Sequence, residues 1–529
     1  MKIFLGKSRQ LTLRDVYRIV THGAEIELDD VAQQAMEASR NVLRRFVDDR
    51  LPIYGVSTQY GDDAYRVHVE GTYEEYLTSL VQRQRNVIRA LNCGVGGESS
   101  EDVVRATILL RAQALAQGAS GVRVELVEAL LNLLRYSVSP VIYRYGSVGA
   151  SGDLIPSSAI ALTLMGEGQV RVQGKLMSAE DALRKAQLTP IVLQMKEGLA
   201  LVNGTSYSTA IAALAVYRLC HLLPLSIAAA ATMAEAMLAT DSAYEPFVHD
   251  IKRHRGQIEV AKFVKNCWRG SGLIRSLKTL REEWRSALLD RGEAVQEHVQ
   301  DFYSLRSLAH GFGPFYEDLE RAVIWTEQEI NSANDNPVID TERKEIHHGA
   351  NFLSDYIAVL GDQLRADIAK GSTWLHALLG NLIHPRKNRG LPSNLMPNPE
   401  KHTGFKTIQL LAASLAIHNR SRSLPVAAVM LPTEGDNQDM VSLGTHSAFD
   451  LAEVTENYAN LVAIMLFAAA QAIELRGKDK ASPLALQILK FVRSKSPFLN
   501  EDRPLHQEFI EITKSLETSG IIEPWFLAN

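Results

Sequence analysis

Apolar residues recur at helical spacing over much of this chain. One such stripe follows Asp29 and Asp30. Residues three and four positions apart share one face of an α-helix, and an aspartate directly before such a stripe is typical of a helix start. The pattern predicts an amphipathic helix that begins near residue 30. Its expected buried face consists of Val31, Ala35, Val42, Leu43, Phe46 and Val47.

Two longer segments, Tyr207–Ala239 and Leu451–Leu475, are apolar on nearly every side. Besides tyrosines and a cysteine, the ionisable side chains of the first segment are Arg218, His221 and Glu235. A helix without a polar face is stable in water only when other protein surrounds it. We therefore expect both segments to be helices buried in a core or between subunits.

Short alternating stretches predict two hairpins, Val170–Met177 around Gly174 and Val338–His347 around a polar turn. No internal repeat and no low-complexity linker interrupts the chain. The pattern as a whole predicts a mainly α protein with small β elements.

The composition suits a large core and excludes several classes of function. The chain has 529 residues, 46% of them hydrophobic, enough for two or three structural regions. Its net charge is −5 and its Lys and Arg residues are scattered, which indicates no nucleic-acid partner. Cys93, Cys220 and Cys267 lie far apart, so neither a disulfide framework nor a zinc site is indicated.

Nothing in the sequence predicts secretion or membrane insertion. The N-terminus becomes polar after five residues, unlike a signal peptide. The longest apolar run, Tyr458–Ile473, contains Asn460 and Gln471 and is short of a membrane span. We expect a cytoplasmic protein without a membrane partner.

Small residues surround Ser151 in the stretch GSVGASGDLIPSSAIALTLMGEG, Gly146–Gly168. So uncrowded a backbone allows the Gly152 nitrogen to attack the Ala150 carbonyl. Ring closure expels one water and dehydration of Ser151 a second, which gives a five-membered ring with an exocyclic methylene. That group is a strong electrophile, which no ordinary side chain supplies.

The alternative is an ordinary glycine loop in which Asp153 caps a helix over Leu154–Met165. A bare Ala-Ser-Gly favours this alternative. The longer GSxGASGDL context, with its trailing proline and GEG, favours the cyclised loop.

That context resembles the histidine and aromatic amino-acid ammonia-lyases and aminomutases. These enzymes make the cofactor methylidene-imidazolone (MIO) from their own Ala-Ser-Gly. Further matching blocks span most of the chain in the family's order, and on them the chain is identified as a member of this family. The blocks are Tyr54–Gly61, Gly146–Gly168, Glu197–Thr205, Gln300–Arg306, Asn331–Pro337, His348–Phe352 and Glu434–Gly444.

The resemblance implies a fold and an assembly. We expect an N-terminal domain with the MIO loop over residues 1–200. A long central and C-terminal helical bundle follows over residues 201–529. The resemblance also implies a homotetramer whose active sites draw on three subunits.

The resemblance implies the residues of the elimination itself. Tyr54 occupies the position of the catalytic base, Tyr303 stands next to MIO, and Ala150, Ser151 and Gly152 form the cofactor. A free tyrosine has a pKa of about 10, so neighbours must lower the pKa of Tyr54 for it to act near neutrality.

Around the base, the sequence departs from the family. Gln59 stands where glycine is common, and it adds hydrogen-bonding groups close to the expected substrate. Ser57 stands where the family has asparagine or threonine.

Other matches imply a site for the substrate. Arg306, in QDFYSLR, is the carboxylate clamp, for which a planar two-pronged guanidinium is suited. The family's Cys-x-Pro-Gln after this block is replaced here, and His310 is either a site histidine or a structural one. The remaining implied contacts are Gln300, Asn203, Asn336, Phe352, Glu434 and Gln438.

Substrate choice is read in this family at two residues, here Ala90 and Leu91. Histidine-type enzymes have histidine at the second place and glutamate where Gln438 stands, and tyrosine lyases often have histidine at the first. An apolar pair suits an unsubstituted aromatic ring, although an apolar pocket discriminates against a substrate with an added hydroxyl by only about a hundredfold.

We therefore expect an ammonia-lyase acting on an aromatic amino acid, with phenylalanine favoured and an arylacrylate as product. A 2,3-aminomutase is the first alternative, since the polar segment Asp62–Tyr76 is unlike most lyases. A non-catalytic helical scaffold is the second, supported by Gln59 and His310 alone. A phosphate-binding loop at Cys93–Gly97 lacks the strand-turn-helix setting such a loop needs.

Overall fold

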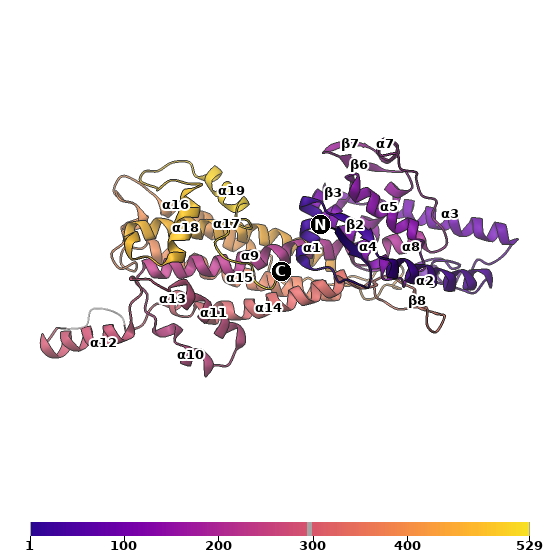
Figure 1. The fold of residues 1–529 in the computed structure, drawn as a ribbon. Coiled ribbons are helices and arrows are strands. Elements are labelled where there is room, and N and C mark those ends of the chain that lie inside the picture. Colours follow the sequence, from indigo (N-terminus) through magenta and orange to yellow (C-terminus); the bar gives the residue numbers. More distant parts are fainter. Residues whose placement is uncertain (1, 294–298, 528–529) are drawn as a thin grey trace.

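The computed structural model of the chain describes residues 2–293 and 299–527. It confirms the mainly α class. The molecule is elongated, with an N-terminal domain at one end and a long helical bundle running to the other (Figure 1).

The N-terminal domain combines helices with small sheets. β1 pairs with β2 in parallel, β3 pairs with β5, and β4, β6 and β7 form an antiparallel sheet. Its elements are β1 (Lys2–Leu5), α1 (Leu13–His22), β2 (Glu25–Leu28), α2 (Asp30–Asp48), α3 (Tyr73–Leu91), β3 (Val95–Glu98), α4 (Glu101–Ala116), α5 (Val124–Arg135), β4 (Val138–Pro140), β5 (Tyr143–Tyr145), α6 (Leu154–Leu164), β6 (Gln169–Val172), β7 (Lys175–Ser178), α7 (Ala179–Lys185) and α8 (Glu197–Val202).

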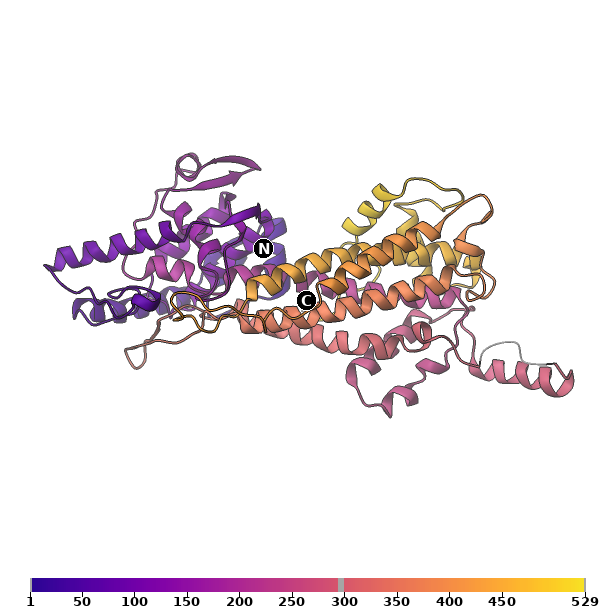
Figure 2. The ribbon, with the colours of Figure 1, turned by 180° about the vertical axis from the view of Figure 1, so that it is seen from behind.

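The second half forms the bundle, from which α12 projects at the end remote from the N-terminal domain (Figure 2). Its elements are α9 (Ser206–Ala236), α10 (Pro246–Asp250), α11 (Arg255–Cys267), α12 (Leu277–Arg285), α13 (Tyr303–Arg306), α14 (Leu308–Ile330), β8 (Val338–Asp340), β9 (Glu345–His347), α15 (Asp355–Ile383), α16 (Phe405–Ser421), α17 (Gly444–Arg476), α18 (Pro483–Arg493) and α19 (His506–Lys514).

The two all-apolar segments are the central helices α9 and α17, which pack on each other, as their composition predicts. Each is long and apolar enough to cross a membrane by length and composition. However, 78% and 83% of their most apolar windows are buried inside the molecule. The Tyr458 hydroxyl of α17 donates to Ser226 Oγ of α9 at 2.8 Å, so these two buried hydroxyls are paired across the contact.

Most of the predicted local elements are present. β6–β7 and β8–β9 are the two expected hairpins. The Asp29 side chain accepts a hydrogen bond from the Ala32 nitrogen and so caps α2. The prediction for Val31 is wrong, since this side chain is 54% exposed. The buried stripe runs through Ala32 and Met36, one position out of register with Val31.

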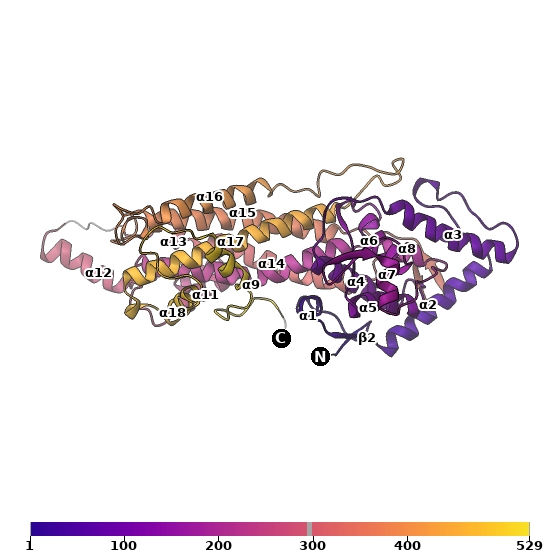
Figure 3. The same ribbon diagram turned by 90° about the horizontal axis from the view of Figure 1, so that it is seen from above.

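Two segments of the second half return to the N-terminal domain. One carries the β8–β9 hairpin, where the Ile339 nitrogen donates to the Ala119 carbonyl at 2.8 Å. The other, residues 422–443, is called the strap below. It leaves α16 and extends over the N-terminal domain before α17 begins (Figure 3). There the Leu443 nitrogen donates to the Val148 carbonyl at 3.1 Å, beside the Ser151 loop.

Candidate active site

The backbone at Gly152 is held in a conformation that only glycine adopts easily. Its φ is +78°, and a Cβ added there would lie 2.2 Å from the Gly204 oxygen. The next nitrogen, that of Asp153, donates to the same Gly204 oxygen at 2.8 Å. The turn after Ser151 is therefore pinned against the residue that follows Asn203.

Ser151 accepts one hydrogen bond on its main-chain carbonyl oxygen and one on its side-chain hydroxyl oxygen. Asn203 Nδ2 donates to its carbonyl oxygen at 2.9 Å, and Gln438 Nε2 donates to its hydroxyl oxygen at 3.1 Å. The Thr433 hydroxyl donates to Gln438 Oε1 at 2.5 Å, which fixes the orientation of that amide. Three predicted site residues from distant parts of the sequence thus meet here.

Asn203 also holds the predicted residue Asn336. Its Oδ1 accepts from the Asn336 nitrogen at 2.7 Å, and Asn336 Oδ1 accepts from the Gly349 nitrogen at 2.7 Å. Both asparagines are buried. Their amide groups are therefore fixed before any ligand arrives.

Arg111, on α4, supports this arrangement and was not singled out from the sequence. It is 2% exposed, and its Nη1 donates to the Asn203 carbonyl at 2.7 Å while Nη2 donates to Asn334 Oδ1 at 2.6 Å. Burial lowers the pKa of this guanidinium, partly offset by Asp335. Its one sequence signal is an arginine inside the apolar run ILLRAQALA.

The capping role that the ordinary-loop alternative gives to Asp153 is wrong. It stands at the N-cap of α6, but its carboxylate makes no capping bond. It is fully buried and accepts from the Ser208 nitrogen at 2.8 Å, from Ser147 Oγ at 3.0 Å and from Thr445 Oγ1 at 2.5 Å. Because donors from α9 and α17 saturate it, Asp153 ties the Ser151 loop to the bundle.

Tyr54 lies on a loop whose own backbone contacts its phenol. The Gly61 nitrogen donates to the Tyr54 hydroxyl oxygen at 3.1 Å, and the Tyr54 nitrogen donates to His348 Nε2 at 3.3 Å. Burial raises the pKa of the phenol and the Glu434 charge adds to this, while the Gly61 hydrogen bond lowers it. Within one chain the neighbours therefore do not supply the expected lowering.

Glu434, on the strap, lies against the Tyr54 loop. A Cβ on Gly61 would be 2.0 Å from its Oε2, and a Cβ on Gly435 would be 2.9 Å from Asp62 Oδ2. Burial and the Asp62 charge raise the pKa of the Glu434 carboxyl. The Tyr54 loop and the strap therefore pack closely together at Gly61 and Gly435, where a larger residue would not fit.

The side chain of Gln59 turns to its own loop. Gln59 Nε2 lies 3.2 Å from His68 Nε2, across a short ladder in which Thr58 pairs with Val67. The predicted substrate-choice residues end α3, with Ala90 exposed and Leu91 half-buried. Phe352 is half-buried and follows the β8–β9 hairpin.

The remaining predicted residues lie at the opposite end of the molecule. Figure 1 shows α13, which carries Tyr303 and Arg306, at the end of the bundle away from the N-terminal domain. Tyr303 is 72% exposed, with the Arg306 guanidinium carbon 4.5 Å from its ring centroid. Among the described residues, Arg306 Nε is buried without a partner. Gln300 and His310 are exposed near them.

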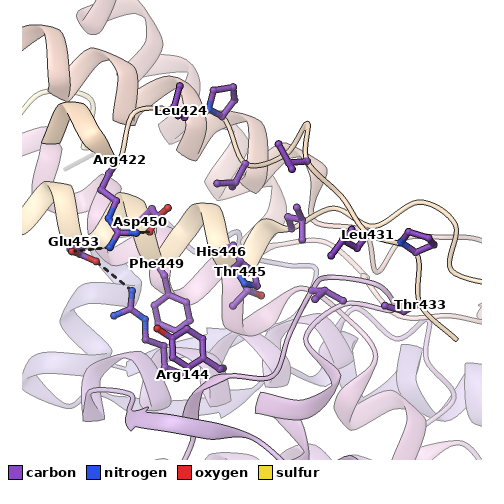
Figure 4. Close-up of a pocket in the computed structure, with 17 residues that line it drawn as sticks. Arg144, Arg422, Leu424, Leu431, Thr433, Thr445, His446, Phe449, Asp450 and Glu453 are labelled. Atoms are coloured by element: carbon purple, nitrogen blue, oxygen red, sulfur yellow. Dashed lines mark hydrogen bonds and ion pairs between the residues drawn. The ribbon is translucent and has the colours of Figure 1, made fainter. Parts of the chain in front are cut away.

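A pocket of about 880 Å³ lies between the strap and the first turns of α17 (Figure 4). Val148, Leu443 and Thr445 line it from the side of the Ser151 loop. Arg144 and Glu453 form an ion pair of 3.4 Å at its far end. Neither Ser151 nor Tyr54 lines it, so this pocket adjoins the site without containing it.

The arrangement fits a group built from Ala150, Ser151 and Gly152. No Cβ fits at Gly152, and an amide donor faces each oxygen of Ser151. Within residues 2–293 and 299–527, no cluster of three or more His, Cys, Asp or Glu residues suits a metal ion.

The mainly α fold and the Ala-Ser-Gly loop with its amide donors are shared with relatives that are carbon–nitrogen lyases. A family model described as aromatic amino acid lyase matches residues 11–494, and the chain belongs to that family. The family is MIO-dependent, so MIO is expected here.

Individual relatives cover nearly the whole chain. A histidine ammonia-lyase of Alkaliphilus oremlandii is 34% identical over 99% of this chain and 98% of its own length. A tyrosine 2,3-aminomutase of Myxococcus fulvus is 32% identical over 93% of each. The crystal structure of a tyrosine aminomutase from Streptomyces globisporus is similar with a TM-score of 0.92 at 32% identity, over 98% of both chains.

Proposed function

We propose that this chain is an ammonia-lyase that converts an aromatic L-amino acid, phenylalanine by preference, to an arylacrylate. The observation that carries the proposal is the Ser151 loop, with Asn203 and Gln438 donating to its two oxygens. In this proposal Ala150, Ser151 and Gly152 cyclise to MIO, which supplies an electrophile for the substrate amine.

The protein's own groups prepare this site. Asn203 Nδ2 is aimed at the Ser151 carbonyl oxygen, where a fixed donor stabilises negative charge without reorganisation. Asn203 is itself held by Arg111 and Asn336. Tyr54 removes the β-proton of the substrate, a task typically worth about 10²–10⁴-fold in rate.

The proposal needs a second copy of the chain. Arg306 and Tyr303 lie at the far end of the bundle from Tyr54 and Ser151 (Figure 1), so a single chain offers two separate half-sites. In a homotetramer, Arg306 of another copy would bind the substrate carboxylate. A cation beside Tyr54 would also lower the pKa of its phenol, which burial raises in the single chain.

Phenylalanine is favoured over histidine by the residues of this chain. Several relatives are named histidine ammonia-lyase. Histidine-type enzymes, however, have histidine where this chain has Leu91 and glutamate where it has Gln438. An apolar pair at Ala90 and Leu91 offers no partner to an imidazole ring. We also propose that the enzyme is cytoplasmic, since its two longest apolar helices are used inside the bundle.

An aromatic 2,3-aminomutase is the second candidate. Solved aminomutases are similar to this chain with TM-scores of 0.92, including a phenylalanine aminomutase of Pantoea agglomerans at 28% identity. Both reactions begin with the same elimination. They differ in how long the arylacrylate and ammonia stay enclosed, which the contact between the Tyr54 loop and Glu434 would govern.

One incubation separates these functions. The purified protein is given phenylalanine, tyrosine or histidine in turn, and arylacrylate, ammonia and β-amino acid are measured together. Arylacrylate and ammonia in equal amounts from phenylalanine support the lyase, and a β-amino acid supports the aminomutase. Turnover of histidine alone overturns the substrate assignment, and no turnover of any amino acid supports the scaffold.

A further inference from the structure

A chain of three polar side chains lies beside Arg306 at the end of the bundle. Gln257 Nε2 of α11 is 2.9 Å from His249 Nδ1 of α10 and 3.2 Å from His310 Nε2 of α14. His249 Nε2 is in turn 3.0 Å from the Ala243 carbonyl oxygen. Figure 1 shows α10, α11 and α13 grouped at this end of the bundle.

These contacts fix which nitrogen of each histidine carries the proton. The Ala243 carbonyl only accepts, so His249 Nε2 donates to it and, in the neutral ring, His249 Nδ1 is an acceptor. The Gln257 amide nitrogen, with two hydrogens, then donates one to His249 and the other to His310. His310 Nε2 is therefore an acceptor, and the neutral ring carries its proton on Nδ1.

His310 lies close enough to Arg306 to feel its charge. The two residues are four apart in the chain, on either side of the turn at Ser307 that separates α13 from α14, and the positive charge of Arg306 acts on His310. His310 is exposed, and within the part of the chain that the structure describes its Nδ1 has no partner.

The charges around His310 keep it neutral. Burial lowers its pKa, and the positive charges of Lys252 and Arg306 lower it further. Burial lowers the pKa of His249 and His310 adds to this, while the hydrogen bond to the Ala243 carbonyl and the Asp250 charge oppose it. The tautomer set by Gln257 therefore applies at neutral pH.

We propose that His310 is a second donor for the substrate carboxylate beside Arg306, held with its proton on Nδ1 by Gln257 and His249. The proposal rests on the function proposed above, in which Arg306 binds that carboxylate. It also gives a role to a residue that stands where the family usually has glutamine.

The first test compares two ligands that differ only at the carboxylate. Dissociation constants of trans-cinnamate and trans-cinnamyl alcohol are measured by calorimetry on the full assembled protein. His310→Leu should weaken cinnamate about tenfold or more, since a hydrogen bond to a charged group is lost, and should leave cinnamyl alcohol within about twofold. His310→Gln, which keeps an amide donor, should retain most of the affinity for cinnamate.

Lys252→Gln is the matched control, because it removes a nearby positive charge without removing the proposed donor. It should change cinnamate binding by less than about threefold. Equal weakening of both ligands by His310→Leu would mean a structural role and would overturn the proposal. So would a loss in Lys252→Gln as large as that in His310→Leu.

A second variant tests the tautomer and needs no change at His310. In Gln257→Glu the carboxylate accepts from His310 Nε2–H, which leaves Nδ1 as an acceptor facing the ligand. Cinnamate affinity should then be lowest at high pH and should recover as the pH falls, because protonation restores Nδ1–H. Wild type should show no such recovery, and a flat profile for Gln257→Glu would contradict the assigned tautomer.

The two proposals fail differently. If wild type does not bind cinnamate at all, the proposed substrate class is wrong and this inference falls with it. If Arg306→Lys loses cinnamate binding while His310→Leu does not, the proposed function stands and the role of His310 is overturned.

Discussion

Gln438 donates its side-chain amide to the Ser151 hydroxyl oxygen at 3.1 Å, although the two residues are 287 positions apart in the chain. The contact joins the strap to the Ser151 loop, which lies between β5 and α6. It places a donor on the oxygen that leaves as water when the loop cyclises. The strap is therefore part of the site and not merely a connection between α16 and α17.

Cyclisation of the loop is directly measurable. The intact chain should weigh less than its sequence by two waters, and Ser151→Ala should abolish both this deficit and the near-ultraviolet band of the cofactor. Ser99→Ala is a suitable control, since its hydroxyl meets Tyr207 outside the loop. A wild-type mass equal to that of the full sequence would support the scaffold.

Tyr54→Phe should reduce kcat by about 10²–10⁴-fold, because only the proton-transferring hydroxyl is removed. The mass deficit should persist, since in the part of the chain that the structure describes the Tyr54 hydroxyl bonds the Gly61 nitrogen and not the Ser151 loop. Steady-state kinetics and intact mass on the same sample test this. A variant that keeps most of its kcat would show that another group is the base.

Arg306→Lys should weaken substrate binding strongly, because a point-charge ammonium does not reproduce a two-pronged carboxylate contact. The expected signature is a raised KM for the amino acid and a raised inhibition constant for the arylacrylate. Arg285→Lys, on the projecting helix α12, is the matched control. Unchanged kinetics in Arg306→Lys would place the carboxylate site elsewhere.

Mixed assemblies test whether two chains share each site. Co-expression of Tyr54→Phe and Arg306→Lys chains should restore activity that neither variant has alone. If each site takes Tyr54 from one copy and Arg306 from another, random assortment leaves about one quarter of the sites intact. Activity no higher than that of the separate variants would mean that both residues act within one chain.

The ring pocket is tested by substrate preference. Ala90→His adds a partner for a phenol, and leaving a buried phenol unpaired costs about 1–3 kcal/mol. The ratio of kcat/KM for tyrosine to that for phenylalanine should therefore rise in this variant. Gln59→Gly, which removes the contact with His68, should leave the ratio nearly unchanged. A wild type that already prefers tyrosine would overturn the assignment of the apolar pair.

The sequence predicts the buried helices well because α9 and α17 are apolar on every side, and only burial satisfies such a helix. It does not predict the partners of Asp153. Those partners, Ser208 and Thr445, lie 55 and 292 residues away, while the local pattern shows only an acid before a helix. The periodicity of apolar residues shows which face of a helix is buried, but it does not show which distant donor bonds a buried side chain such as Asp153.

The same limit applies to the site. The resemblance gives roles to Asn203 and Tyr54 but none to Arg111 and His348, which bond their main chains. An arginine in an apolar run signals a buried charge, yet its acceptors become evident only when α4 is packed against the turn after α8. Residues that position others are therefore recognised only in the structure, whereas residues that match a family motif can be recognised in the sequence.

If each active site takes Tyr54 from one copy and Arg306 from another, as proposed, turnover depends on how much of the protein is assembled. A dissociated chain would keep its folded Ser151 loop and its Arg306 end, yet neither would meet the other. Specific activity would then depend on protein concentration and fall on dilution, while helical content stayed constant. Any condition that dissociates the assembly, such as a change of salt or temperature, would then lower activity without changing any group that takes part in the reaction.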